Sequence, residues 1–127
     1  MDTTRVLLVD DEQDFLDLMQ KRMAKRKIDL HVASSGQEAL DLIRNSFFNV
    51  VILDVKMPGM DGIETLRQLR ILSPDTQVIM LTGHADVETA VKGMELGAFD
   101  YMMKPMSFDY LLMKIQEANS MRSIGGM

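Results

Sequence analysis

The sequence predicts an α/β fold in which five helices cover a doubly wound, five-stranded parallel sheet with strand order 2-1-3-4-5. Short β-prone runs and longer amphipathic stretches alternate five times within 127 residues. The β-prone runs are continuously apolar, as in Val50–Leu53, which is typical of parallel strands covered on both faces. Right-handed crossovers make a doubly wound sheet the default arrangement, with a ligand crevice outside the carboxyl ends of the strands. The length of the chain predicts one domain, residues 1–127.

The first half of the chain supplies two strands and two helices. The first strand is predicted at Arg5–Val9. The helix expected at Asp14–Arg26 is rich in acids near its beginning and in bases near its end, which matches the helix dipole. The second strand is predicted at Leu30–Ala33. Ser35 followed by Glu38 is a capping-box pattern, and it starts a second helix that runs to about residue 46.

The third strand, Val50–Leu53, leads into a loop rich in Pro and Gly. Apolar residues at positions 63, 66, 69 and 72 then predict a third helix that stops before Pro74. The fourth strand is expected at Gln77–Leu81, and the fourth helix from about residue 86 to residue 96. Gly93 lies inside this helix and costs about 1 kcal/mol relative to Ala, so we expect the fourth helix to be the weakest.

The end of the chain supplies the last strand and the last helix. The fifth strand is predicted at Tyr101–Met103, and Ser107 can cap a fifth helix with apolar positions 111, 112 and 115. The helical pattern fades into a Ser-Ile-Gly-Gly-Met ending. We therefore expect a folded core over residues 5–118 and a flexible tail over residues 119–127.

Composition excludes several classes of protein. Fourteen Lys and Arg against 19 Asp and Glu leave a net charge of -5, which repels nucleic-acid phosphates. The chain has no Cys, so disulfides, thiolate metal sites and a cysteine nucleophile are excluded. Its apolar runs are far shorter than a membrane span, and its first residues are unlike a signal peptide. We expect a cytoplasmic protein that binds neither nucleic acid nor membrane.

Polar side chains follow the strands where each strand ends. Asp10 and Asp11 follow the first strand, Asp54 the third, Thr82 the fourth and Lys104 the fifth. Because the carboxyl ends of parallel strands meet at one edge of a sheet, these side chains are expected to converge. Three neighbouring carboxylates must either hold protons at raised pKa values or share a cation. Oxygen ligands without His or Cys point to Mg²⁺.

The strand order assigns roles within this cluster. Asp54 ends the central strand and is predicted to be the nucleophile, whereas Asp10 and Asp11 lie to one side and are better placed to hold the metal. Lys104 and the metal would neutralise transferred charge, and Thr82 would donate to an oxygen. Taken singly, each residue has an ordinary structural interpretation: a salt bridge for Lys104, a helix cap for Thr82, and helix N-terminal acids for the first two aspartates. Their combination favours a Mg²⁺-assisted phosphoryl site.

At these residues the sequence strongly resembles the receiver domain of bacterial two-component response regulators, the module that accepts phosphate from a histidine kinase. Four ordered blocks within residues 5 to about 118 carry the resemblance: Val6–Glu12, Leu53–Gly62, Leu81–Gly83 and Ala98–Pro105. The resemblance implies that Asp54 is the phosphoacceptor and that Asp10 and Asp11 belong to the Mg²⁺ site. It also implies that the backbone carbonyl of Lys56 completes this site, that Thr82 and Lys104 contact the phosphoryl group, and that Lys104–Pro105 is a cis peptide.

The resemblance also implies how the phosphoryl group is used. Tyr101 resembles the aromatic switch of the family, which turns inward when Thr82 is drawn toward the phosphoryl group. Lys56 and His84 occupy the two variable positions that tune the phosphate lifetime. The fourth helix is our candidate for the part that moves. The face made by this helix, the fifth strand and the fifth helix is the expected surface for a partner or for a homodimer.

The expected protein is a signalling switch that catalyses only its own phosphorylation and dephosphorylation, with a sensor histidine kinase or a phosphotransfer protein as donor. A Mg²⁺-dependent phosphohydrolase is the chief rival, but Val55 and Lys56 follow Asp54 where that class has a second Asp. A flavodoxin-like module would need a phosphate loop where Asp10, Asp11 and Glu12 stand. A degenerate receiver used only for docking does not fit the complete site. The output stays open: a stand-alone receiver, an excised domain, or part of a regulator with a DNA-binding, ATPase or enzymatic module.

Overall fold

A computed structural model of the chain describes residues 3–56, 62–83 and 87–125, with side chains to residue 121. Its five strands form one parallel sheet in the order β2-β1-β3-β4-β5, so the predicted fold class is confirmed. The strands are β1 (Thr4–Val9), β2 (Ile28–Ala33), β3 (Val50–Asp54), β4 (Gln77–Thr82) and β5 (Asp100–Met103). The helices between and after them are α1 (Gln13–Met23), α2 (Gly36–Asn45), α3 (Gly62–Leu72), α4 (Val87–Glu95) and α5 (Phe108–Gly125).

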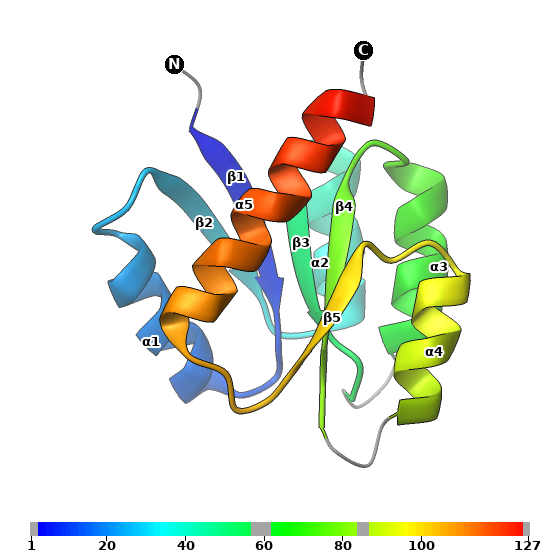
Figure 1. The fold of residues 1–127 in the computed structure, drawn as a ribbon, viewed down its shortest axis with the longest axis horizontal. Helices are drawn as coiled ribbons and strands as arrows, with labels where there is room; N and C mark the ends of the chain where they lie inside the picture. Colours follow the sequence, from blue (N-terminus) through cyan, green and yellow to red (C-terminus); the bar gives the residue numbers. More distant parts are fainter. Residues whose placement is uncertain (1–2, 57–61, 84–86, 126–127) are drawn as a thin grey trace.

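The helices cover both faces of the sheet (Figure 1). One face packs against α1 and α5, and the cluster there includes Leu8, Ile52 and Leu111. The other face packs against α2 and α3, and its cluster includes Leu7, Val51 and Leu66. Because β3 lies at the centre and all five of its residues are buried, alternate side chains along it enter the two clusters.

Most predicted boundaries lie within two residues of the observed ones, but two helices differ. The helix predicted at Asp14–Arg26 ends at Met23, and residues 24–27 form turns that bring the chain back to β2. The bases beyond Met23 are therefore turn residues at the end of the helix. The helical backbone of α5 continues to Gly125, past residue 118 where the sequence pattern fades. The expected start of the fourth helix, residue 86, lies outside the described residues.

The structure confirms the predicted capping box at the start of α2 and explains the glycine at the start of α3. The Ser35 hydroxyl accepts a hydrogen bond from the Glu38 backbone N–H at 3.1 Å, and Oε1 of Glu38 accepts one from the Ser34 N–H at 3.1 Å. At Gly62 a Cβ would overlap the Cα of Val55 and lie 2.9 Å from the carbonyl oxygen of Asp54. Only glycine therefore lets α3 begin this close to the end of β3.

Among the described residues, no helix is both long enough and apolar enough to span a membrane.

Candidate phosphoacceptor site

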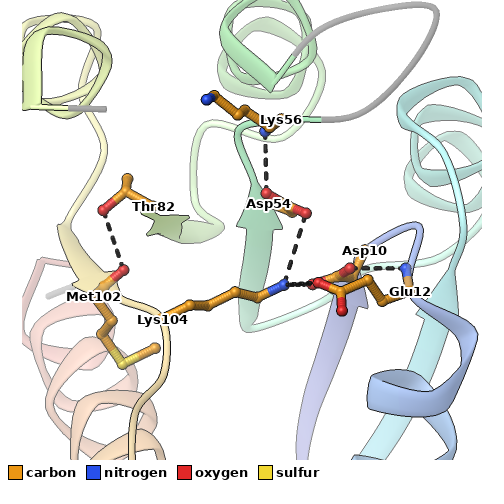
Figure 2. A network of polar contacts seen from close by, with 7 residues as sticks. All are labelled: Asp10, Glu12, Asp54, Lys56, Thr82, Met102 and Lys104. Carbon is orange, nitrogen blue, oxygen red and sulfur yellow. Dashed lines mark hydrogen bonds and ion pairs between the residues drawn. The ribbon is translucent and has the colours of Figure 1, made fainter. Parts of the chain in front are cut away.

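Four strands deliver polar side chains to one edge of the sheet, as the sequence predicts. Asp10 follows β1, Asp54 ends β3, Thr82 ends β4 and Lys104 follows β5 (Figure 2). The strands are in register there, because Val9 pairs with Leu53, Asp54 with Leu81 and Thr82 with Met103. Parallel pairing thus carries residues far apart in sequence to the same level of the edge.

Three carboxylates form the centre of the site. Asp10, Asp11 and Asp54 each offer one oxygen, and these oxygens all lie within 4.8 Å of one another. Asp10 is fully buried and Asp54 is 8% exposed, whereas Asp11 is exposed. Two backbone groups orient the buried pair: Oδ1 of Asp10 accepts from the N–H of Glu12 at 2.9 Å, and Oδ1 of Asp54 accepts from the N–H of Lys56 at 3.0 Å.

Lys104 brings a positive charge into this cluster. Its Nζ lies 2.6 Å from Oδ2 of Asp10, 2.9 Å from Oε1 of Glu12 and 3.8 Å from Oδ2 of Asp54 (Figure 2). The side chain is 23% exposed, so these contacts are only partly screened by water. The peptide bond from Lys104 to Pro105 is cis, as the resemblance implies.

The electrostatics of the site act on Asp54 and Lys104 in related ways. Burial raises the pKa of Asp54 to about 6, and the nearby charges of Asp10 and Asp11 add to this; the Lys56 N–H and Lys104 oppose it. Burial acts to lower the pKa of Lys104. Its hydrogen bonds to Asp10 and Glu12 and the charges around it outweigh burial, so this pKa lies above its ordinary value. Lys104 therefore stays charged.

The donor set fits a hard divalent cation. The three carboxylates lie close enough to share one ion, and one ammonium leaves them with surplus negative charge. Burial is the main cause of the raised pKa of Asp54, and the charges of Asp10 and Asp11 raise this pKa further. Mg²⁺ prefers one or two carboxylates and several waters, which suits an edge where Asp11 faces solvent. Lys56 places its N–H on Asp54, and its side chain extends away from that carboxylate (Figure 2).

Thr82 and Tyr101 stand beside this cluster. Thr82 is 3% exposed, and its hydroxyl donates to the carbonyl of Met102 at 3.4 Å. Thr82 is therefore the last residue of β4, and its hydroxyl bonds to β5. Tyr101 is 43% exposed and lines an apolar cavity of about 430 Å³ between α4 and β5, together with Thr82, Ala90 and Met103. His84, the other predicted lifetime position, lies outside the described residues.

Sequence reasoning missed two partners of Lys104. Glu12 forms an ion pair with it, and the ring of Phe15 lies beneath its ammonium, with Nζ 4.7 Å from the ring centroid. Glu12 directly follows Asp10 and Asp11, the two predicted metal ligands, so nothing in the sequence indicates that it pairs with Lys104. In the sequence Phe15 is an ordinary apolar position of α1, because only the three-dimensional structure brings the Lys104 side chain over its ring.

Known proteins match this chain in sequence and in fold. A family profile described as response regulator receiver domain matches residues 6–116. The chain is 38% identical over 120 residues to Regulatory protein AtoC of Escherichia coli K12, an alignment covering 94% of this chain and 26% of AtoC. It is 37% identical over 112 residues to Response regulator MprA of Mycobacterium sp. KMS, covering 88% of this chain and 49% of MprA. The chain thus spans about a quarter to a half of these curated relatives.

A solved structure agrees along almost the whole chain. The CheY-like receiver domain protein from Methanospirillum hungatei JF-1 superimposes with a TM-score of 0.93 at 34% identity, covering 98% of this chain and 99% of that one. The chain belongs to the response regulator receiver domain family. It is a phosphoacceptor module of two-component signalling, which decides against the phosphohydrolase and flavodoxin-like alternatives.

Proposed function

We propose that Asp54 is the residue that accepts the phosphoryl group, with Asp10 and Asp11 holding Mg²⁺ and Lys104 and Thr82 contacting the phosphoryl oxygens. The observation that carries this assignment is the central position of Asp54. It ends the middle strand, one oxygen belongs to the acidic cluster, and Oδ2 lies 3.8 Å from the Lys104 ammonium. With a pKa of about 6, this carboxyl is mostly ionised at pH 7 and is a competent nucleophile.

The transfer needs no proton from Asp54. A carboxylate oxygen forms the new bond to phosphorus, and the bond between phosphorus and the donor histidine nitrogen breaks with its electron pair going to nitrogen. The donor is a sensor histidine kinase or a phosphotransfer protein. Asp10, Asp11 and the backbone carbonyl of Lys56 would hold Mg²⁺, which would neutralise negative charge during the transfer. Lys104 neutralises part of the remaining charge, and Thr82 donates its hydroxyl after releasing Met102.

The chain then acts as a switch whose only catalysis is its own phosphorylation and dephosphorylation. In this proposal the residues at positions 56 and 84 tune the phosphate lifetime. The proposed output surface is the face of α4, β5 and α5, where Val87, Val91 and Tyr101 are exposed around the apolar cavity. A partner protein, an output module or a second copy binds there, in the cytoplasm.

Replacing the acceptor tests this assignment. Asp54→Asn keeps the shape of the side chain but removes the nucleophilic charge, so we expect it to abolish labelling by acetyl phosphate in the presence of Mg²⁺. The measurement is intact mass, which gains one phosphoryl group in the wild type. Asp41→Asn, which changes an exposed acid on α2, is the matched control and should label normally. Continued labelling of the Asp54 variant would place the acceptor elsewhere.

A further inference from the structure

The ammonium of Lys104 lies over the face of an aromatic ring. Its Nζ is 4.7 Å from the centroid of Phe15, within the distance at which the ring quadrupole attracts a cation. Phe15 stands in the first turn of α1, is half-buried, and packs against the core cluster between α1, α5 and the sheet. The ring is therefore held by its neighbours, whereas a long lysine side chain has many rotamers to lose.

The ring differs in kind from the other partners of Lys104. Asp10 and Glu12 attract the ammonium, but each is a charged acceptor. Each therefore competes with an incoming phosphoryl oxygen for the N–H groups of Lys104. Glu12 is also 65% exposed, so its ion pair is screened by water. Phe15 carries no net charge and accepts no conventional hydrogen bond. The ring can hold the ammonium in place while the N–H groups of Lys104 remain available to oxygens on the other side.

We propose that Phe15 is a positioning residue for phosphoryl transfer: its ring keeps the Lys104 ammonium beside Oδ2 of Asp54. This inference rests on the proposed roles of Asp54 and Lys104. Lys104 is only 23% exposed, so part of its hydration is already lost and the ring supplies attraction where water does not. Losing the quadrupole leaves the ammonium to Asp10 and Glu12, away from the acceptor.

A purely structural role for Phe15 predicts a different pattern of variants. If the ring only fills the space between α1 and the sheet, its volume matters and its electronic character does not. Trifluorophenylalanine at position 15 keeps the shape of the ring and weakens its quadrupole. Phe15→Tyr keeps the quadrupole with a slightly altered shape. Phe15→Leu removes the ring and keeps an apolar side chain.

Two measurements on the full chain separate these roles. The first is the proton chemical shift of the Lys104 side chain without metal or phosphate, since methylene protons over a ring face are shifted upfield; Phe15→Leu should abolish that shift and Phe15→Tyr should retain it. The second is the rate of labelling by acetyl phosphate with Mg²⁺. We expect the trifluoro and Leu variants to label about 3- to 10-fold more slowly, and Phe15→Tyr to stay within about twofold of the wild type.

Phe108→Leu is the matched control. Phe108 is also half-buried, packs on the same cluster and lies beneath two cations, Arg22 and Arg26, at 5.5 and 5.8 Å, but those cations are not part of the site. It should label as the wild type does. Equal labelling rates for wild type and the trifluoro variant would overturn the role of Phe15 alone. Failure of the wild type to label at Asp54 would overturn the proposed function, and this inference with it.

Discussion

At the scale of single residues, the site is built around a carboxylate whose charge the protein disfavours until a cation arrives. Asp54 follows four fully buried aliphatic residues and has Asp10 and Asp11 beside it. Burial and these charges raise its pKa to about 6, and the ammonium of Lys104 offsets only part of this effect. A carboxylate in this state gains most from a divalent ion, which links metal binding to readiness for phosphoryl transfer.

This predicts a pH-dependent stability in the absence of metal. Because the pKa of Asp54 is raised from 3.8 to about 6 on folding, its ionised form destabilises the folded state, progressively from pH 4 and fully above pH 6. Asp54→Asn should therefore raise the free energy of unfolding at pH 8, by on the order of 3 kcal/mol, and by much less at pH 4. Urea unfolding with a chelator present measures the difference. A gain of the same size at both pH values would contradict this origin.

The residues of the site show what a linear sequence can and cannot reveal. The convergence of Asp54, Asp10 and Lys104 could be predicted because each ends or directly follows a strand, and these parallel strands end at one edge. The partners Glu12 and Phe15 could not be predicted, because their contacts with Lys104 join the start of α1 to a residue about 90 positions later in the chain. Strand ends are fixed by topology, whereas helix side chains are placed by packing.

At the scale of elements, α4 packs closely against β4 at Gly93. Gly93 is buried, and a Cβ there would overlap Sδ and Cε of Met80 on β4. The sequence predicted Gly93 as a weakness of this helix, and the structure adds its reason: the missing methyl group makes room for Met80. This thioether lies two residues before Thr82, so the contact joins α4 to the strand that carries the predicted switch hydroxyl.

Gly93→Ala is therefore expected to act in opposite directions in two backgrounds. In the wild type, the helix gains about 1 kcal/mol of propensity, but overpacking against the buried Met80 costs about 1–3 kcal/mol, so the variant should be less stable. In a Met80→Val background the overlap is relieved, and the same substitution should stabilise. Denaturant unfolding of the four proteins gives the coupling free energy.

Gly62→Ala is the comparison for that cycle. There the added methyl group would overlap the backbone of Val55, which cannot rotate away as a methionine side chain can. We expect a larger loss of stability at Gly62 than at Gly93, without rescue by a Met80 substitution. Additive effects of the Gly93 and Met80 changes would show that α4 is not seated in this way.

A helix boundary could be predicted where its cause is local in the sequence. The start of α2 could be predicted because Ser35 and Glu38 bond within one turn of the chain. The end of α1 could not, because the bases after Met23 suit a helix C-terminus and a turn equally well. What ends the helix is the return of the chain to β2, a tertiary requirement that propensity does not contain.

At the scale of the whole molecule, a change at Asp54 can reach the outer face through few steps. Thr82 holds the carbonyl of Met102 by a long hydrogen bond of 3.4 Å, and Tyr101 stands next to Met102 at the mouth of the apolar cavity. If Thr82 acts as proposed, we expect a phosphoryl oxygen to draw its hydroxyl away from Met102 and to open space beside the Tyr101 ring. Residues of α4 also line this cavity, so we expect a change in the position of the Tyr101 ring to favour a different position of that helix.

Amide hydrogen exchange tests this path. Beryllofluoride, bound with Mg²⁺ as a mimic of the phosphoryl group, should change the exchange protection of α4, Val87–Glu95. Protection in α2, which follows β2 at the opposite edge of the sheet from β5, should stay nearly unchanged. Tyr101→Ala should reduce the response in α4 without preventing binding of the mimic. Unaltered protection in α4 of the wild type would remove this helix from the switch.

The architecture was the most predictable level, since continuous apolar strands and right-handed crossovers leave few arrangements of five strands. All strand pairings follow from that order, and these pairings bring the acidic residues together at one edge of the sheet. The cavity beneath Tyr101 was not predictable, because its walls come from α4, β4 and β5 together. A void is a property of packing, and no short stretch of sequence contains it.

The ion pair between Asp10 and Lys104 joins residues 94 positions apart in the chain. Asp10 follows the first strand of the sheet, and Lys104 follows the last. A nascent or truncated polypeptide that lacks β5 would have its acids but not its counter-charge, and so could not take up phosphate efficiently. On the proposed roles of Asp54 and Lys104, we therefore expect a chain to become competent for phosphorylation only when its sheet is complete.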